Sequence, residues 1–348
     1  MASPVSIPRI TALGTAVPAG EIEHAFRRWA DGQIDDDRQR TLFHRMADRA
    51  GISHRYSVLG DPVAFYEAEP FPTTARRMAL FASEAPDLAL RAVAGLHADL
   101  AGITHLVVAC CTGFMAPGID QVIARRLGLA VNVERVVIGF MGCYAGVTAL
   151  RSAGHIVRAN PQARVLVVAV ELCTLHLQQT NSVEALLAMR QFADGAAAAV
   201  VCGSGAGLAL GTGISRVLDD SAELITWTVG DTGFAMHLAG AVPGRLADAF
   251  GDAALTQVLA PEGTHAFAVH PGGRSILDAV ERGLHLPPEK LAASRAVLAE
   301  NGNMSSASVL FVLARLWTER PTSGIALAFG PGLALEGLHF GWTDGDAG

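Results

Sequence analysis

The sequence predicts an α/β protein whose sheet is covered by helices on both faces. Two observations lead to this fold class. Short apolar runs that contain β-branched residues alternate along the chain with longer stretches of helical period, and 51% of the 348 residues are hydrophobic. Such runs are typical of buried strands, and their alternation with helices favours a mainly parallel sheet. A chain of this length has room for one large domain or two closely packed ones.

Strands and helices are predicted from the periodicity and from Gly and Pro signals at their ends. The predicted strands are 105–113, 135–140, 164–172, 196–203, 266–270 and 325–330. The predicted helices are 37–50, 74–96, 118–128, 143–159, 183–192, 274–284 and 304–317. Strand, glycine turn and helix follow one another both around Cys143 and around His270. This suggests an internal duplication in which the two residues occupy the same topological place.

One stretch resembles a membrane span, because no charged residue occurs from Gly195 to Ser215. Its apolar members are mostly alanine, which provides too little hydrocarbon for insertion, so we interpret it as strand, turn and strand. The glycines of GSGAGLALGTG, residues 203–213, do not follow GxGxxG, and no amphipathic helix begins directly after them. We predict a turn there, near the junction of two halves, rather than a dinucleotide-binding loop.

Composition excludes several classes of function. The net charge is −7 and Lys290 is the single lysine, which argues against a general nucleic-acid surface. The N-terminal MASPVSIPRI lacks a basic start, a long apolar core and a cleavage site, which argues against secretion. Five cysteines in so long a chain do not form a disulfide framework. We therefore expect a cytoplasmic protein.

Cys143 lies in GFMGCYAG, residues 139–146, where a predicted strand meets a predicted helix. A sulfur at a helix N-terminus is close to unpaired N–H groups and to the positive end of the helix dipole, and both stabilise a thiolate. Gly142 and Gly146 suit a tight turn and leave room for a thioester to approach the backbone. An inert buried cysteine explains this segment equally well by itself.

The other cysteines differ from Cys143, because none of them opens a helix between glycines. They are Cys110, Cys111, Cys173 and Cys202. Their spacing fits no zinc-ligand pattern. We interpret them as core or cavity-wall residues.

Two further segments offer partners for a thiolate nucleophile. In HPGGRSIL, His270 ends a predicted strand before a glycine turn, and strand C-termini are where open α/β sheets collect active residues. In ENGNMSSASVLF, Asn303 precedes another helix, and its amide can donate to a developing negative oxygen without titrating. Each also has a plainer interpretation, Asn303 as a helix N-cap and His270 as a core histidine.

With these segments assembled, the chain resembles the type III polyketide synthases, the chalcone synthase-like branch of the thiolase superfamily. The resemblance covers about residues 8–341, and its motifs occur in the family's order: GFMGCYAG, ARVLVVAVELCTL, QFADGAAAAVV, AVHPGGRSILDAVE, NGNMSSASVLF and AFGPGLALE. It implies a five-layer αβαβα fold of two related halves, residues 1–205 with the cysteine and residues 206–348 with the histidine and asparagine. It also implies a homodimer.

By resemblance, Cys143 corresponds to the acyl-accepting nucleophile, and His270 and Asn303 to the pair that supports decarboxylation and condensation. Such an enzyme loads an acyl-CoA starter on the cysteine, extends it with malonyl-CoA by decarboxylative Claisen condensation, and cyclises the chain to a pyrone or a resorcinol-type phenolic product. It requires no metal, no redox cofactor and no carrier protein. An imidazolium–thiolate pair between His270 and Cys143 would make the sulfur nucleophilic at neutral pH.

The resemblance also implies residues that shape the cavity. Phe192, in QFADG, corresponds to a gatekeeper between the coenzyme A tunnel and the cavity, although Ala193 stands where the family usually has glycine; a plain core phenylalanine is the alternative. Met236 replaces a second family phenylalanine, so the mouth of the cavity is expected to be softer and differently shaped. His176 and Trp227 fall where family members vary the cavity.

Coenzyme A carries phosphates, so a local basic surface is expected even in an acidic protein. Arg45 and Arg49 share one face of the predicted helix 37–50 and correspond to phosphate-binding positions, whereas Leu42 stands where the family often has a lysine. A solvated helix face is the alternative. The family's loop beside the active site corresponds to Gly330, Pro331 and Gly332.

Three other functions stay open on the sequence. A ketoacyl-ACP synthase III uses the same three residue types in the same fold, although HPGGR and GNMSS favour the polyketide branch by resemblance. A papain-like protease also uses Cys, His and Asn, but GCYAG lacks the local signature of that class. A non-catalytic acyl-CoA-binding or interaction protein is the last alternative.

Overall fold

A mixed sheet of nine hydrogen-bonded strands runs through the structure, a computed structural model that describes residues 7–345. The strand order is β11-β12-β13-β8-β1-β7-β6-β4-β5. In chain order these strands are β1 (Arg9–Ala16), β4 (His105–Cys110), β5 (Glu134–Gly139), β6 (Arg164–Leu172), β7 (Asp194–Cys202), β8 (Gly207–Val217), β11 (Ala266–Val269), β12 (Gly324–Gly330) and β13 (Ala334–Thr343). Two antiparallel ribbons pair separately: β2 (Gly20–Glu21) with β3 (Tyr56–Ser57), and β9 (Ile225–Gly230) with β10 (Gly233–Leu238).

All seven predicted helices are confirmed, and residues 7–345 form five further α-helices. They are α1 (Glu23–Gln33), α2 (Asp37–Arg49), α3 (Pro62–Tyr66), α4 (Thr74–Ala94), α5 (Ile119–Arg126), α6 (Ala145–Ala159), α7 (Val183–Met189), α8 (Val242–Ala249), α9 (Ala253–Leu259), α10 (Arg274–Gly283), α11 (Ala292–Asn301) and α12 (Ser308–Leu316). Within residues 7–345, no helix combines the length and the apolar character that crossing a membrane requires.

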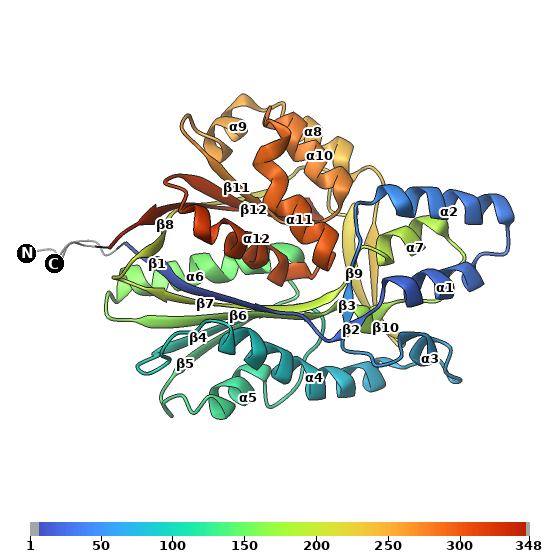
Figure 1. Cartoon of the computed structure of the whole chain (residues 1–348), viewed down its shortest axis with the longest axis horizontal. Coiled ribbons are helices and arrows are strands. Elements are labelled where there is room, and N and C mark those ends of the chain that lie inside the picture. The colour runs from blue at the N-terminus through green and yellow to red at the C-terminus, as the bar shows by residue number, and fades with distance from the viewer. Residues whose placement is uncertain (1–6, 346–348) are drawn as a thin grey trace, which may run out of the picture.

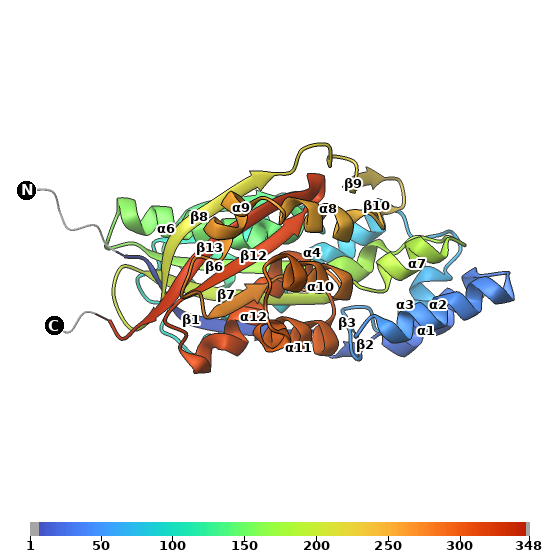
Figure 2. The same cartoon turned by 90° about the horizontal axis from the view of Figure 1, so that it is seen from above.

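The elements form five layers (Figure 1). Helices α4 and α5 cover the outer face of β1, β7, β6, β4 and β5. Helices α6 and α12 form the middle layer, between those strands and the strands β8, β13, β12 and β11. Helices α8, α9 and α10 cover the far face. Seen from above, α1, α2, α3 and α7 gather at one end (Figure 2). The five-layer architecture is therefore confirmed.

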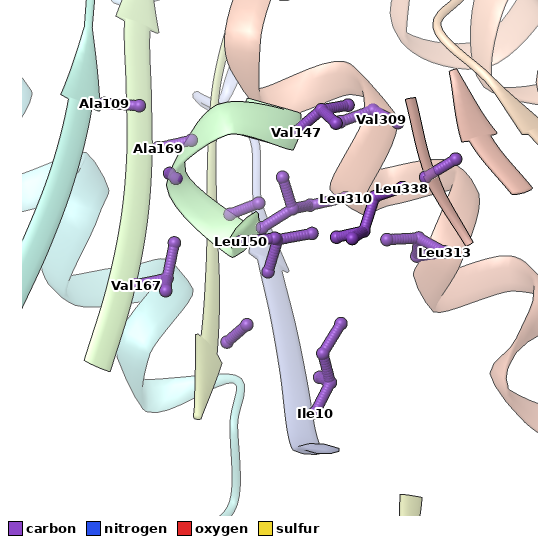
Figure 3. Packing of buried hydrophobic residues seen from close by; sticks show 14 of the residues in the cluster. Ile10, Ala109, Val147, Leu150, Val167, Ala169, Val309, Leu310, Leu313 and Leu338 are labelled. Atoms are coloured by element: carbon purple, nitrogen blue, oxygen red, sulfur yellow. The ribbon is translucent and has the colours of Figure 1, made fainter. Parts of the chain in front are cut away.

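The middle layer is held by an apolar core that both parts of the sheet share (Figure 3). Its members include Val147 and Leu150 from α6, Val309, Leu310 and Leu313 from α12, Val167 from β6 and Leu338 from β13. Helix α12 is buried on almost every side, which explains why its sequence is apolar around the whole helix. The packing brings the starts of both central helices together, with the short helices η1 (Gly142–Tyr144) and η4 (Ser305–Ala307) in contact.

Strand pairing repeats between the two halves. Strand β4 pairs parallel with β6, and β6 pairs antiparallel with β7, which pairs antiparallel with β1. Strands β11, β12, β13 and β8 repeat this pattern. In this correspondence, Asn303 before α12 is the counterpart of Cys143 before α6, whereas His270 after β11 is the counterpart of Cys111 after β4. The prediction that His270 repeats the place of Cys143 was therefore wrong.

Two other predictions about the sheet were wrong. The sheet is mixed rather than mainly parallel, because β1, β8 and β13 pair antiparallel with their neighbours. The prediction failed because the sequence pattern did not reveal these three strands. The glycine-rich segment 203–213 was predicted as a turn, but only residues 203–206 form one, and β8 begins at Gly207. The interpretation of residues 195–215 as strand, turn and strand is confirmed.

Candidate active site

Cys143 is buried at the start of α6, with 7% of its surface exposed. After β5 the chain turns through Gly142, whose φ of +77° favours glycine, and enters η1 and then α6. A Cβ at Gly142 would lie 2.3 Å from Cδ of Pro331, and a Cβ at Gly146 would lie 2.1 Å from the Ser306 carbonyl oxygen. The two glycines therefore allow the loop of Pro331 and the helix η4 to pack directly against the turn.

Asn303 approaches Cys143 from the other central helix. Burial raises the pKa of the Cys143 thiol, and the nearby side chains of Ser305 and Asn303 act in the opposite direction. Asn303 Oδ1 accepts a hydrogen bond from the Ser305 N–H at 2.8 Å, so the amide nitrogen is left to donate. The structure thus brings together two residues that the sequence connected only by resemblance, and it adds Ser305, which we had not singled out.

Backbone hydrogen bonds couple Asn303 to Phe192. The Asn303 N–H donates to the Gln191 carbonyl at 2.7 Å, and the Asn303 carbonyl accepts from the Ala193 N–H at 2.9 Å. Buried Arg55 donates from Nη1 to the Phe192 carbonyl at 2.7 Å. The segment 190–193 is therefore held from both sides.

His270 follows β11, and its ring is buried with no hydrogen-bond partner for Nδ1 or Nε2 among residues 7–345. Burial lowers the pKa of His270 to about 3 and raises the pKa of the Cys143 thiol to about 12. Each group is then neutral at pH 7, because burial disfavours the charged form. The unliganded site therefore favours a thiol and a neutral imidazole, not the imidazolium–thiolate pair expected from the sequence.

Glu171, at the end of β6, is a buried carboxyl group that the sequence reasoning missed. It accepts hydrogen bonds from the Cys111 N–H at 3.0 Å, from Thr112 Oγ1 at 2.8 Å, and from Ser306 Oγ. The Cys111 sulfur in turn accepts from the Gly142 N–H at 3.0 Å. Burial raises the pKa of Glu171 to about 7. One acidic residue in the otherwise apolar VLVVAVEL, residues 165–172, was the available signal, because a buried carboxyl group requires hydrogen-bond partners.

Two inner cavities share a wall, and the narrower one reaches the nucleophile. A narrow one of about 20 Å³ is lined by Cys143, Ser305 and Pro331 among others, and a larger one of about 220 Å³ is lined by His176 and Thr180 among others. Their shared wall consists of Cys173, Phe192, Trp227 and Met236. All four residues predicted to shape the cavity therefore line one cavity or both.

His176, in the wall of the larger cavity, links the segment of Thr112 to the segment of Phe234. Its Nε2 lies 2.6 Å from the Thr112 carbonyl oxygen, and its Nδ1 accepts from the Phe234 N–H at 3.1 Å. The ring also stacks on Phe234, with centroids 4.2 Å apart. Both nitrogens are thus engaged with the backbone, which fixes the neutral tautomer with the proton on Nε2.

An outer groove lies on the other side of segment 190–193. One part, of about 440 Å³, is lined by Leu42, Met46 and Gln191 among others. The adjoining part, of about 500 Å³, is lined by Arg49 and by Arg274, a basic residue that the sequence reasoning missed although it belongs to HPGGR. Neither part is lined by Arg45, which is exposed elsewhere on α2. Gln191 faces the groove and Phe192 the inner cavities, so this segment forms the partition between them.

The loop after β12 also reaches the nucleophile. A Cβ at Gly330 would lie 3.3 Å from the Cys143 backbone nitrogen, and Pro331 lines the narrow cavity. Gly332 has a φ of +70°. Over the described part of the chain the cysteines are free thiols, and no group of three or more His, Cys, Asp or Glu side chains is placed to hold a metal ion.

Family models now identify the class of protein. The model for the N-terminal domain of chalcone and stilbene synthases matches residues 6–206, and the model for their C-terminal domain matches residues 209–341. The chain therefore belongs to the chalcone and stilbene synthase family, the type III polyketide synthases. It is a condensing enzyme of the acyltransferase class.

Individual relatives are consistent with this family. The chain is 34% identical, over 97% of its length and 92% of the relative, to the alpha-pyrone synthesis polyketide synthase-like Pks18 of Mycobacterium tuberculosis. It matches the type III domain of Steely1, a type I/III hybrid from Dictyostelium, with a TM-score of 0.86 and 28% identity over 97% of this chain and 99% of that one. It matches PKS-I of the brown alga Ectocarpus siliculosus with a TM-score of 0.87 and 28% identity over 99% and 100% of the two chains.

Proposed function

We propose that this enzyme loads an acyl-CoA starter on Cys143, extends it with malonyl-CoA, and releases a pyrone or a resorcinol-type phenolic product. The observation that carries the proposal is that the Asn303 side chain lies beside the Cys143 thiol, where the two central helices begin. Strand β12 supports the inclusion of His270 in the same site. The backbone N–H of His270 donates to the Leu327 carbonyl of that strand at 2.7 Å, and Gly330 at the strand's end lies against the Cys143 turn.

In the loading step, His270 acts as the base. Its unpaired, neutral ring can accept the Cys143 proton when a thioester enters, and the thiolate then attacks the acyl carbonyl carbon. The carbon–sulfur bond to coenzyme A breaks, and the departing thiolate takes the proton back from His270. Because the ring and the thiol are each neutral before the reaction, charge develops only in the presence of substrate.

In the extension step, malonyl-CoA loses carbon dioxide and leaves an enolate. The Asn303 amide and the His270 N–H can donate to the enolate oxygen, where negative charge develops. The enolate carbon attacks the thioester carbonyl on Cys143, which forms a carbon–carbon bond and releases the cysteine sulfur. This chemistry uses coenzyme A thioesters as substrates and requires neither a metal nor a redox cofactor, and no carrier protein takes part in it.

The outer groove is the proposed site for coenzyme A. Arg49 and Arg274 supply positive charge there, and the Arg274 side chain is fixed by donating from Nη1 to the Arg49 carbonyl at 2.9 Å. Arg45, on the same helix, is proposed to contact the phosphates from outside the groove. Phe192 is proposed to gate the passage from the groove to Cys143, because it stands in the partition.

The proposal includes a homodimer of two-part chains that acts in the cytoplasm. Division near residue 205 is supported by the repeated strand pairing and by the residues that the two family models match. Strand β5 is the proposed dimer contact, because this edge of the sheet carries Val136, Val137 and Phe140, each about half exposed. An unpaired apolar edge strand requires a cover in solution.

The test is to give the purified protein a panel of acyl-CoA starters with malonyl-CoA. We expect an acyl adduct on Cys143 by peptide mass spectrometry, carbon dioxide release, and cyclised products. Cys143→Ala should remove the adduct and reduce product formation by at least about a thousandfold, because it removes the proposed nucleophile. Asn303→Ala should keep the adduct and slow decarboxylation by about a hundredfold.

Other results would identify the alternatives. Absence of both adduct and carbon dioxide rejects the proposal. A strict requirement for malonyl attached to a carrier protein indicates a ketoacyl-ACP synthase III. Binding of coenzyme A that survives Cys143→Ala, without turnover in the parent, indicates a non-catalytic binding protein.

A further inference from the structure

The wall shared by the two inner cavities offers few hydrogen-bond donors. Phe192 and Met236 have no N–H or O–H in their side chains. In the larger cavity, both ring nitrogens of His176 are already engaged with the backbone. The side-chain nitrogen of Gln178 donates to two carbonyls, and its oxygen accepts from Thr232 Oγ1.

Trp227 differs from these neighbours. Its Nε1 is buried and has no hydrogen-bond partner among residues 7–345, although its ring borders both cavities. The ring is held in place by edge contacts with His176 and Phe234, with centroids 6.2 Å and 6.1 Å apart. It lies on β9 directly across from Met236 on β10. A fixed indole whose N–H has no partner therefore borders both cavities.

An unpaired indole N–H is not sufficient evidence for a ligand, as Trp29 demonstrates. The Nε1 of Trp29 is also buried and unpaired. Trp29 packs against Phe26 and Tyr66 in the outer core and lines none of the cavities described above. Trp227, unlike Trp29, lines the cavity of the nucleophile, so its ring borders the space that a chain attached to Cys143 would enter.

We propose that Trp227 Nε1–H donates a hydrogen bond to a ketone oxygen of the polyketide chain on Cys143 and so helps to select the product. The inference rests on the proposed function. Each extension adds one carbonyl acceptor at every second carbon of the chain, whereas an alkyl starter tail has none. A donor fixed at one point in an otherwise apolar wall holds one of these oxygens. It thereby sets which atom of the chain reaches the thioester carbonyl.

The decisive comparison removes the N–H but keeps the aromatic wall. Trp227→Phe does so with a smaller ring. Replacement of Trp227 by β-(3-benzothienyl)alanine through nonsense suppression keeps the ring shape and exchanges the N–H for sulfur. Trp29→Phe is the matched control, because it loses an unpaired indole N–H away from the cavities. Products are quantified by mass spectrometry, together with carbon dioxide release and the Cys143 adduct.

In both Trp227 variants we expect the ratio of the parent's major product to all other products to fall about fivefold, the effect of one neutral hydrogen bond. Acyl loading of Cys143 and carbon dioxide release are measured for each variant, so that a change in the product ratio is separated from a general loss of activity. Trp29→Phe should keep the parent's product ratio. An unchanged ratio in the benzothienyl variant overturns the inference, because it shows that ring shape rather than the N–H controls the product. A parent without carbon dioxide release instead rejects the proposed function on which the inference rests.

Discussion

At the level of single residues, the two buried histidines of the site differ in their hydrogen bonding. His176 uses both ring nitrogens, whereas His270 uses neither. In both cases burial lowers the pKa, to about 4 for His176 and to about 3 for His270. The first ring is therefore suited to hold the cavity wall, and the second is available to a substrate.

The His176 pKa predicts how stability depends on pH. A histidine whose pKa is lower in the folded than in the unfolded protein binds more protons when unfolded, so stability is complete above about pH 6.5 and is lost as the pH falls toward 4. Between pH 8 and pH 5 this histidine should cost about 2 kcal/mol of unfolding free energy. His176→Gln keeps a donor and an acceptor but does not titrate. Between pH 8 and pH 5 the variant should therefore lose about 2 kcal/mol less unfolding free energy than the parent.

Urea unfolding at the two pH values measures the difference. His237→Gln is the control, because His237 is exposed on β10. Equal losses of unfolding free energy in the parent and in His176→Gln would contradict the lowered pKa of His176.

At the level of elements, the turn from β5 into α6 requires glycine for two reasons: other segments of the chain pack closely against it, and Gly142 has a positive φ. Gly142 combines a φ of +77° with contact to Pro331, and Gly146 lies against the backbone of η4. The sequence suggested that these glycines make room for a thioester. The structure gives an additional reason, because three segments of the chain meet at the turn.

Gly142→Ala should therefore disturb the nucleophile. The new Cβ would overlap Pro331 in a backbone conformation that alanine resists, so we expect acyl loading of Cys143 to slow by at least about tenfold and the melting temperature to fall. The matched control is Gly244→Ala in α8, where no heavy atom lies within 4 Å of the added Cβ. Stopped-flow measurement of acyl transfer and thermal unfolding compare the two variants, and equal effects would refute the explanation.

At the level of the whole molecule, the strand at one end of the sheet is apolar where it faces solvent. Val137 of β5 is 48% exposed, and beside it the rings of Phe114 and Phe140 lie 6.3 Å apart. Phe140 also lines the narrow cavity of Cys143. A second copy on this edge would therefore cover the outer side of the active site.

Val137→Arg should convert the proposed dimer to a monomer, because a charge at the centre of an apolar contact is left without a partner. Sedimentation velocity measures the change. Val258→Arg is the control, since Val258 is 50% exposed on α9, away from this edge. A parent that sediments as a monomer, or a dimer that survives Val137→Arg, would exclude β5 as the contact.

The sequence predicted the buried elements well and the partly exposed strands poorly. Strands β4, β6 and β12 are mostly apolar because both of their faces are covered, so their pattern is clear. Strands β8 and β13 contain glycines, and part of β8 is exposed, so neither pattern stands out.

The candidate site, too, could be predicted only in part from the sequence. The resemblance selected Cys143, Asn303 and Phe192, and the structure places them in contact or in one wall, while their catalytic roles stay predictions. Glu171 and Arg274 were missed because their partners lie far away in the chain: Glu171 bonds to Ser306, and Arg274 bonds to Arg49. Contacts of this kind become visible only when the chain is folded.

The repeated pairing of the strands has a consequence for where the chemistry lies. The helices α6 and α12 are counterparts, and they begin at one point between the two halves. One half supplies a sulfur at that point, and the other supplies an amide. A strictly symmetric pair of halves would carry either two nucleophiles or two donors. The two halves therefore divide the labour, and neither holds a complete reaction.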